Sequence, residues 1–413
     1  MNKVKLENFG IEFIVPMRDK PKKFEGNIPW CRIEDIEGKY LNGTKSNKYV
    51  SEQIVEQMNL KVLPKNSLIF SCSATIGVVA INTVPLCTNQ TFIGMTSSDK
   101  LDINYLFYHL KLYGESLKKI ASQTTIPYIS KEKFQQLEIF SRDIKTQQKI
   151  ASVLSSLDDK IELNNKINTE LEAIAKTLYD YWFVQFEFPN AEGKPYKSSG
   201  GKMLFNEILK REIPEGWEVK NIKEIADIVD CLHSKKPNFS LEDSNFYLAQ
   251  LENVLDNGQF NNSYKYFVSK MDYNIWTSRI EVKENDILVT NAGRVGANCQ
   301  IPEGVYCGIG RNITAIRPKD IFPTYFHLAF RGFDIQKQIK LNTDQGAFFQ
   351  SLNVKGIKML NFLIPELNIL NDFESFVSSI RKKRDHLLKQ NQELATLRDW
   401  LLPMLMNGQV KVE

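Results

Sequence analysis

The 413-residue sequence predicts an α+β protein in which two related α/β domains are separated by two long antiparallel coiled-coil helices. Three observations predict this fold. They are an internal repeat of about 220 residues, a change in the spacing of apolar residues after each half, and a turn-rich segment between the halves. At ~100 to 200 residues per domain, the length also allows two or three folded units.

The repeat is clearest where an apolar strand runs into a turn of small residues. Residues 66–77 read N-S-L-I-F-S-C-S-A-T-I-G, and 219 positions later residues 285–296 read N-D-I-L-V-T-N-A-G-R-V-G. Other similar pairs are 103–107 with 323–327 and 129–137 with 352–360. Because the offset drifts only from 219 to 223, as small loop insertions would produce, we expect two domains of the same fold.

After each domain, apolar residues recur at the heptad spacing that is typical of a long helix. Each helix would be ~55 Å long at 1.5 Å per residue, which favours two helices that bury their apolar rows against each other. Asn168 and Asn391 occupy equivalent positions, where a buried Asn would fix the register and an exposed one would simply face solvent. The residues predicted to form the seam and to support partner docking are Leu154, Leu157, Ile161, Asn168, Leu171 and Leu178 in the first helix, and Ile380, Leu387, Asn391, Leu394 and Leu401 in the second.

Turn-forming residues such as P-N-A-E-G-K-P and S-S-G-G-K separate the first helix from the second domain and predict a linker. The chain is therefore expected to divide in order into a first domain at 1–143, a first helix at 144–187, a linker at 188–212, a second domain at 213–368, and a second helix with a C-terminal tail at 369–413.

Composition excludes several classes of protein. With 42% hydrophobic and 25% charged residues the chain is neither disordered nor collagen-like, and a net charge of +4 is too small to identify a polyanionic partner. The absence of an apolar run of ~18 residues or of an apolar signal core at residues 1–10 predicts a cytoplasmic protein. No C-x-x-C pair and no nearby His at metal-ligand spacing accompany the cysteines, which predicts reduced thiols and no metal site. These cysteines are Cys31, Cys72, Cys87, Cys231, Cys299 and Cys307.

Catalytic motifs are missing from the sequence. It contains no G-x-x-x-x-G-K-[S/T] phosphate loop, no G-x-S-x-G nucleophile elbow and no H-E-x-x-H. The asparagine-proline-proline-aromatic signature of amino-methyltransferases is also missing. We therefore expect a binding protein with no catalytic residue and no cofactor of its own.

In these features the chain resembles the specificity subunit of type I restriction-modification systems along essentially its whole length. The resemblance rests on I-P-E-G-W at 213–217 with I-K-E-I at 222–225, on the turns S-A-T-I-G at 73–77 and A-G-R-V-G at 292–296, and on Q-Q-K-I-A at 147–151. The I-P-x-G-W opening stands before the second domain and not before the first, so the start of the first domain departs from the family pattern.

The resemblance implies two target recognition domains that each read half of a split sequence in double-stranded DNA. It also implies two methyltransferase subunits that carry S-adenosylmethionine and dock on the helices, with two ATP- and Mg-dependent restriction subunits joining them. Alternatives are a related type II-like system with fused methyltransferase-nuclease chains, a methyltransferase or nuclease in its own right, and a coiled-coil scaffold that binds only protein.

Recognition of DNA requires cations at phosphates and hydrogen-bonding side chains at base edges. Arg311 could contact guanine, and Asn or Gln could contact adenine. Each of these residues could instead satisfy its own turn or form part of a solvated face. The predicted DNA contacts are Arg18, Lys20, Lys22, Lys23, Ser73, Thr75, Gly77, Asn89 and Gln90 in the first domain, and Lys235, Lys236, Asn291, Gly293, Arg294, Gly296, Arg311 and Asn312 in the second.

Overall fold

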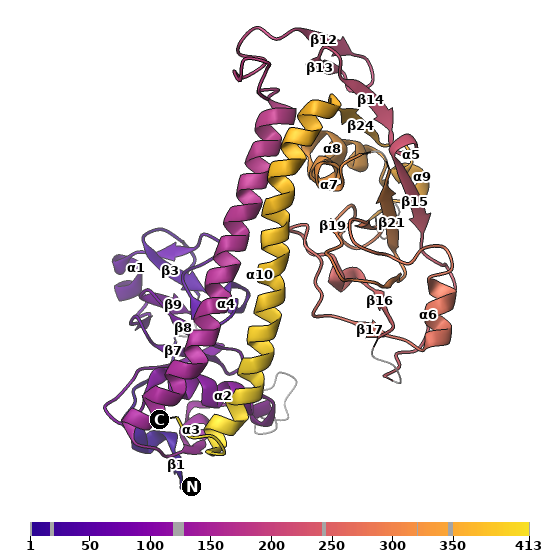
Figure 1. Cartoon of the computed structure of the whole chain (residues 1–413). Coiled ribbons are helices and arrows are strands. Elements are labelled where there is room, and N and C mark those ends of the chain that lie inside the picture. Colours follow the sequence, from indigo (N-terminus) through magenta and orange to yellow (C-terminus); the bar gives the residue numbers. More distant parts are fainter. Residues whose placement is uncertain are drawn as a thin grey trace. The chain divides into compact units, whose positions relative to one another are not determined.

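The computed structural model describes residues 2–16, 20–118, 128–241, 245–319, 321–345 and 350–412. The chain forms two compact units. Unit 1 comprises residues 1–164 and 390–413, and unit 2 comprises residues 165–389. Each unit therefore contains one strand-rich domain together with part of both long helices (Figure 1).

The two long helices are α4 (Ile144–Tyr179), which continues into a π-helical turn at Asp180–Val184, and α10 (Leu367–Asn407). In both units they run antiparallel. Asn164 contacts Asn391 and Asp158 contacts Arg398 in unit 1, so residue numbers fall along one helix as they rise along the other. The predicted α+β fold with two long helices and a repeated domain is confirmed.

The two domains contain corresponding sheets, which is the structural form of the repeat. In unit 1 the main sheet has the order β2-β10-β7-β8-β4, and in unit 2 it has the order β15-β21-β18-β19. The strands of the first sheet are β2 (Phe13–Ile14), β10 (Phe92–Met95), β7 (Leu68–Ser71), β8 (Val79–Asn82) and β4 (Tyr40–Leu41). Those of the second are β15 (Ala226–Asp230), β21 (Ile313–Pro318), β18 (Ile287–Thr290) and β19 (Asn298–Gln300).

A second, smaller sheet packs beside the main one in each domain. The orders are β5-β3-β9-β6 in unit 1 and β17-β16-β20 in unit 2. The strands are β5 (Tyr49–Val50), β3 (Ile28–Cys31), β9 (Leu86–Thr88) and β6 (Val62–Leu63) in unit 1, and β17 (Tyr266–Phe267), β16 (Tyr247–Ala249) and β20 (Gly308–Ile309) in unit 2. Each domain also pairs its first strand with its last, β1 (Lys3–Lys5) with β11 (Glu138–Phe140) and β14 (Glu218–Asn221) with β24 (Asn361–Ile364).

The central strand β7 is buried on both faces, which explains its continuous apolar run. Leu68 and Phe70 belong to a core shared with the helices, whereas Ile69 faces a core shared with the smaller sheet. Strand β18 repeats the arrangement, because Ile287 faces the helix side and Leu288 the smaller sheet. The helix-side core lies against α2 (Ile103–Lys118) in unit 1, and against α7 (Pro323–Arg331) and α8 (Phe333–Leu341) in unit 2.

Shorter helices precede or follow these strands at corresponding places. Helix α1 (Glu52–Gln57) corresponds to α6 (Lys270–Trp276), and α3 (Lys131–Gln135) corresponds to α9 (Val354–Ile357). Ser or Asn side chains cap all four: Ser51, Ser269, Ser130 and Asn353 each accept a hydrogen bond from a backbone N–H of the first turn. Unit 2 also contains α5 (Ile222–Ile225), which Asn221 caps.

The segment predicted as a linker is folded rather than open. Within 188–212, β12 (Met203–Asn206) pairs with β13 (Arg211–Pro214) in a hairpin. Phe188 stacks between Tyr196 and Trp217, with ring centroids 4.6 and 4.9 Å apart. Its turn-forming residues signalled a linker, but its aromatic side chains attach it to the core of unit 2.

The helix seam contains more polar residues than the heptad pattern predicted. Of the predicted apolar seam residues, Leu154 and Leu387 are buried. The others are half-buried, namely Leu157, Ile161, Leu171, Leu178, Ile380, Leu394 and Leu401. Asn164 donates hydrogen bonds to Gln390 and Asn391 in unit 1, at 2.8 Å each. Asn168 is buried in unit 2, where its amide has no hydrogen-bond partner among the described residues. Asn164, absent from the predicted seam, is therefore the residue that bonds Asn391.

Asp158 is a buried carboxylate in the seam of unit 1. It accepts hydrogen bonds from the Tyr108 hydroxyl at 2.6 Å and from Arg398 at 2.5 Å. We predict that Arg398→Ala lowers the free energy of unfolding by about 3 to 5 kcal/mol, because Asp158 keeps its charge in the interior without its cation. Urea denaturation followed by circular dichroism measures this. The double variant Asp158→Leu with Arg398→Leu should lose less stability than Arg398→Ala alone, and an equal or larger loss would contradict the explanation.

Candidate nucleic-acid interface

Three loops meet at one edge of the main sheet in unit 1. The strand register places Ile14, the end of β2, opposite Gly94, and Ser71, the end of β7, opposite Phe92, near the start of β10. The chain after β2, the turn after β7 and the turn before β10 therefore leave the sheet on the same side. We call the described residues 15–16, 20–27, 72–78 and 89–91 the unit 1 loop edge.

The same three loops meet in unit 2. Asp230, the end of β15, lies opposite Thr314, and Thr290, the end of β18, lies opposite Ile313 at the start of β21. The described residues 231–241, 245–246, 291–297 and 310–312 form the unit 2 loop edge. Most of the predicted DNA contacts, although dispersed in sequence, are thus brought to one edge in each unit; Arg18 lies outside the described residues.

The turn after the central strand is built by the same hydrogen bonds in both units. Ser71 donates its hydroxyl hydrogen to the Thr75 carbonyl at 2.6 Å, and Thr290 does the same to the Arg294 carbonyl. The backbone N–H of Gly77 bonds the Ser71 carbonyl at 3.1 Å, matched by Gly296 and Thr290 at 2.9 Å. The turn is therefore held by its own backbone and one strand hydroxyl, so the turn itself does not depend on the side chains at its tip.

Backbone geometry accounts for the glycines that the sequence offered as DNA contacts. Gly77, Gly293 and Gly296 have φ angles of 98°, 77° and 77°. These left-handed angles favour glycine. A Cβ on Gly296 would also come within 2.9 Å of the Ile339 side chain. The structure therefore gives these glycines a conformational role.

The turns are also tied to the loop before the neighbouring strand. Cys72 donates its backbone N–H to the Thr91 carbonyl at 2.8 Å, and Asn291 donates to the Asn312 carbonyl at 2.8 Å. A further backbone bridge joins Ser73 to Tyr128, as another joins Ala292 to Ser351. In each loop edge, backbone hydrogen bonds therefore connect the turn after the central strand to the loop before the neighbouring strand.

Several predicted contacts already have side-chain partners within the protein. Arg294 forms an ion pair with Asp256 at 2.6 Å and donates to the carbonyls of Leu251, at 2.8 Å, and Val254. Its guanidinium therefore holds the 251–256 loop against the turn, which differs from the predicted contact with base or phosphate. Four other predicted side chains also have partners. Asn89 accepts a hydrogen bond from Thr91 and Asn291 accepts one from Thr314. Lys23 forms an ion pair with Glu25, and Lys236 Nζ lies over the Tyr266 ring, 3.7 Å from its centroid.

The remaining predicted side chains are available for a ligand. Among the described residues, none of them has a hydrogen bond or ion pair made by its side chain, and all except half-buried Ser73 are exposed. They are Lys20, Lys22, Ser73, Thr75 and Gln90 in unit 1, and Lys235, Arg311 and Asn312 in unit 2. Each loop edge thus combines free cations with free hydrogen-bonding groups, which is what contact with phosphates and base edges requires.

Sequence inspection missed one cluster of potential metal ligands, at the unit 2 loop edge. The ligand atoms of Asp230, Cys231 and His233 lie within 4.8 Å of one another, and His233 Nε2 is 2.9 Å from Asp230 Oδ2. The spacing Cys-x-His was the available signal. Burial and the Asp230 charge raise the pKa of the Cys231 thiol, which disfavours the thiolate that a soft metal needs. The His233–Asp230 pair is therefore the interaction that this geometry supports. All six cysteines are free and buried.

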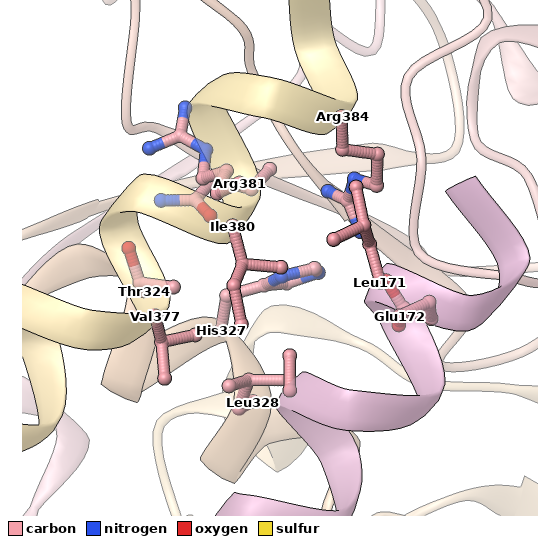
Figure 2. A pocket seen from close by; sticks show the side chains of 11 residues that line it. Leu171, Glu172, Thr324, His327, Leu328, Val377, Ile380, Arg381 and Arg384 are labelled. Atoms are coloured by element: carbon pink, nitrogen blue, oxygen red, sulfur yellow. The ribbon is translucent and has the colours of Figure 1, made fainter. Parts of the chain in front are cut away.

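Unit 2 also contains a small polar hollow where α4 and α10 meet α7. His327, Glu172 and Arg384 gather there (Figure 2). Its cavity volume of about 20 Å³ has room for roughly one water molecule, so it is no substrate pocket. Glu172 forms ion pairs with both Arg331 and Arg384, whereas His327 Nε2 has no hydrogen-bond partner among the described residues.

Comparison with known proteins identifies the family. The model for the type I restriction modification DNA specificity domain matches residues 15–173 and again residues 214–392. The MjaIX specificity subunit of a type I restriction enzyme from Methanocaldococcus jannaschii is 28% identical over 393 residues, covering 94% of this chain and 88% of that protein. The HindI specificity subunit from Haemophilus influenzae is 24% identical over 351 residues, covering 72% and 74%.

A solved structure has the same fold. The crystal structure of a type I restriction-modification S subunit from M. genitalium aligns over 98% of this chain and 95% of that one, with a TM-score of 0.55 and 18% identity. Among the described residues of the present chain, no helix is long and apolar enough to cross a membrane.

Arg294 provides a test of whether this loop edge is internally braced. We predict that Arg294→Ala lowers the free energy of unfolding by about 1.5 to 3 kcal/mol, since its carbonyl partners lose charge-assisted hydrogen bonds. Arg311→Ala is the matched control. It removes the same group from a free position and should leave stability unchanged. If urea denaturation gave equal stabilities for the two variants, the bracing role of Arg294 would be excluded.

The buried histidines predict the pH dependence of stability. Burial, with nearby Arg331, Arg384 and Arg381, holds the pKa of His327 well below its usual range, and burial with Lys3 lowers that of His109 to about 3. The unfolded chain binds these protons near pH 6.5 and the folded chain does not. Each histidine should therefore lower the unfolding free energy by about 1.4 kcal/mol per pH unit below about pH 6.5.

The measurement is urea denaturation between about pH 7 and about pH 5. His327→Gln should reduce the slope by the contribution of one proton. Identical slopes for His327→Gln and the parent chain would show that His327 accepts a proton in the folded state.

Proposed function

The chain belongs to the type I restriction-modification DNA specificity family, and from that premise we propose that it is the DNA-recognition subunit of such a system. In this proposal each loop edge reads one half of a bipartite target in double-stranded DNA. The chain then directs partner methyltransferase and restriction subunits to that target. We propose that it does so in the cytoplasm.

One observation carries the proposal: a single turn scaffold, repeated in the two units, exposes different side chains. The Ser71 and Thr290 hydrogen bonds build equivalent turns, yet Gln90 stands where Arg311 does, and the free Thr75 stands where Arg294 is held by Asp256. A repeated scaffold with different tips is suited to read two different half-sites. Free lysines beside each turn supply the charge that holds phosphates in register.

The long helices support docking of two copies of one partner. Ile174 on α4 and Leu397 on α10 are related by the same offset of 223 as the rest of the helices. Both are apolar and exposed, at 48% and 43%. We propose that each receives one methyltransferase subunit. The chain would contribute no catalytic group. S-adenosylmethionine would bind to the methyltransferase subunits. ATP and Mg would bind to two restriction subunits.

Lys22 tests the proposed phosphate contact. We predict that Lys22→Ala weakens binding of the assembled methyltransferase to all duplexes alike and reduces the slope of log affinity against log salt by about one. Fluorescence titration at several salt concentrations measures both quantities. Lys65→Ala is the control, because Lys65 is exposed but precedes β7 at the opposite edge of the sheet. Equal effects of the two variants would contradict the placement of DNA at the loop edge.

Docking can be tested by adding charge at the two equivalent positions. We predict that Ile174→Asp and Leu397→Asp each remove one methyltransferase subunit from the complex and that the double variant removes both, because a carboxylate would be buried without a partner. Native mass spectrometry counts the subunits. Ser379→Asp adds the same charge at an exposed polar position of α10 and should retain both. Retention of both subunits by the double variant would move the docking surface elsewhere.

A further inference from the structure

We propose that Gln90 and Arg311 are specificity-determining residues at equivalent points of the two half-sites, Gln90 reading an adenine and Arg311 a guanine. This inference rests on the proposed DNA-recognition function and assigns bases to it. Four properties of the two residues support it: their place in the sheet, the fixed backbone around them, their free side chains, and the chemistry of those side chains.

Both residues stand at the middle of their loop edge. Gln90 precedes β10, which lies between β2 and β7, and Arg311 precedes β21, which lies between β15 and β18. A loop from the neighbouring strand therefore flanks each residue on either side. Phosphate contacts fix the position of a protein on the duplex, and base-edge contacts in a groove carry the sequence. We place the central residue at the groove and the flanking loops at the two backbones beside it.

The backbone at these positions is fixed before any ligand binds. The residue after Gln90 is Thr91, whose carbonyl accepts the Cys72 N–H at 2.8 Å. The residue after Arg311 is Asn312, whose carbonyl accepts the Asn291 N–H at 2.8 Å. A side chain on such a turn loses less conformational freedom on binding than one on an untethered loop.

Their side chains are free, as are those of Ser73, Thr75 and Asn312, whereas several other polar side chains nearby already have partners. Gln90 and Arg311 are exposed and have no hydrogen bond or ion pair with any described residue. Close by, Asn89 accepts hydrogen bonds from Thr91, and Arg294 is held by Asp256. Among the described residues of the two loop edges, Gln90 and Arg311 are thus a pair of equivalent positions at which a Gln or Arg side chain remains free to form two parallel hydrogen bonds.

Bidentate chemistry assigns the bases. An Arg guanidinium fits the O6 and N7 acceptors of guanine in the major groove, and a Gln amide fits the N6 donor and N7 acceptor of adenine. The free Lys20, Lys22 and Lys235 are point charges and are better suited to phosphate. The two half-sites should therefore differ at the equivalent position, with an A·T pair read by unit 1 and a G·C pair read by unit 2.

Exchange of the two side chains tests the assignment. The variants Gln90→Arg and Arg311→Gln are made in the full chain, assembled with its methyltransferase partners, and the methylated sites in cellular DNA are mapped. We expect Gln90→Arg to change one position of one half-site from A·T to G·C, and Arg311→Gln to change one position of the other half-site from G·C to A·T. In each case the second half-site should stay the same.

Titrations with defined duplexes give the magnitude. Gln90→Ala and Arg311→Ala should each reduce discrimination at the affected base pair by about 10- to 100-fold, while affinity for a duplex already mismatched there changes little. Lys22→Ala is the matched control, and it should weaken binding to every duplex equally. Because both positions are exposed turns, circular dichroism and subunit composition should match those of the parent complex.

Three results would overturn the inference. A uniform loss of affinity on all duplexes for Gln90→Ala and Arg311→Ala would make the residues phosphate contacts. Unchanged affinity and an unchanged methylated sequence would remove them from the interface. Methylation by the parent complex without any sequence preference would instead refute the proposed function itself, and this result is distinguishable because it involves no variant.

Discussion

The turn that follows the central strand of each main sheet is the constraint on which the loop edges depend. A strand that leaves the sheet and returns within a few residues must satisfy its backbone polar groups without neighbours. Here a strand hydroxyl, from Ser71 or Thr290, meets a carbonyl of the turn, and a left-handed glycine closes it. Because the backbone satisfies itself, the side chains at the tip are free to differ between the two units.

Arg294 is an exception, because its side chain at the tip of the turn does have a structural role. An exposed arginine between two glycines has the features of a ligand contact, yet its guanidinium donates to two carbonyls of the 251–256 loop and holds that loop in place. Unit 1 carries Thr75 at the equivalent position and has no such brace there. Exposure and charge alone therefore do not identify a binding residue, whereas the partners that a side chain already has can exclude it.

The sequence predicted features that depend on nearby residues better than contacts between distant ones. The repeat was predictable from similar stretches of sequence about 220 residues apart, and the long helices and the turns from the spacing and type of neighbouring residues. Arg294 and Asp256 are 38 residues apart, so their ion pair carried no local signal. The predicted seam residues are buried or half-buried, but the contact of Asn391 with Asn164 was not predictable, because a heptad pattern places residues on a seam without showing which residue of the other helix each one meets. In the predicted linker, aromatic side chains outweighed the turn-forming residues around them.

The buried charges near the helices show how a duplicated chain keeps its halves distinct. In unit 1, Lys39 donates to Ser155 at 2.7 Å and lies over the Tyr108 ring. In unit 2 the position equivalent to Tyr108 is Leu328, and Arg331, which corresponds to Lys111, pairs with Glu172. Buried ion pairs contribute little net stability, but a mismatched one is costly. A domain packed on the wrong part of the helices would bury a charge without its partner. The different polar contacts thus determine which part of the helices each domain packs against. The apolar cores, which are similar in the two units, supply the free energy of packing.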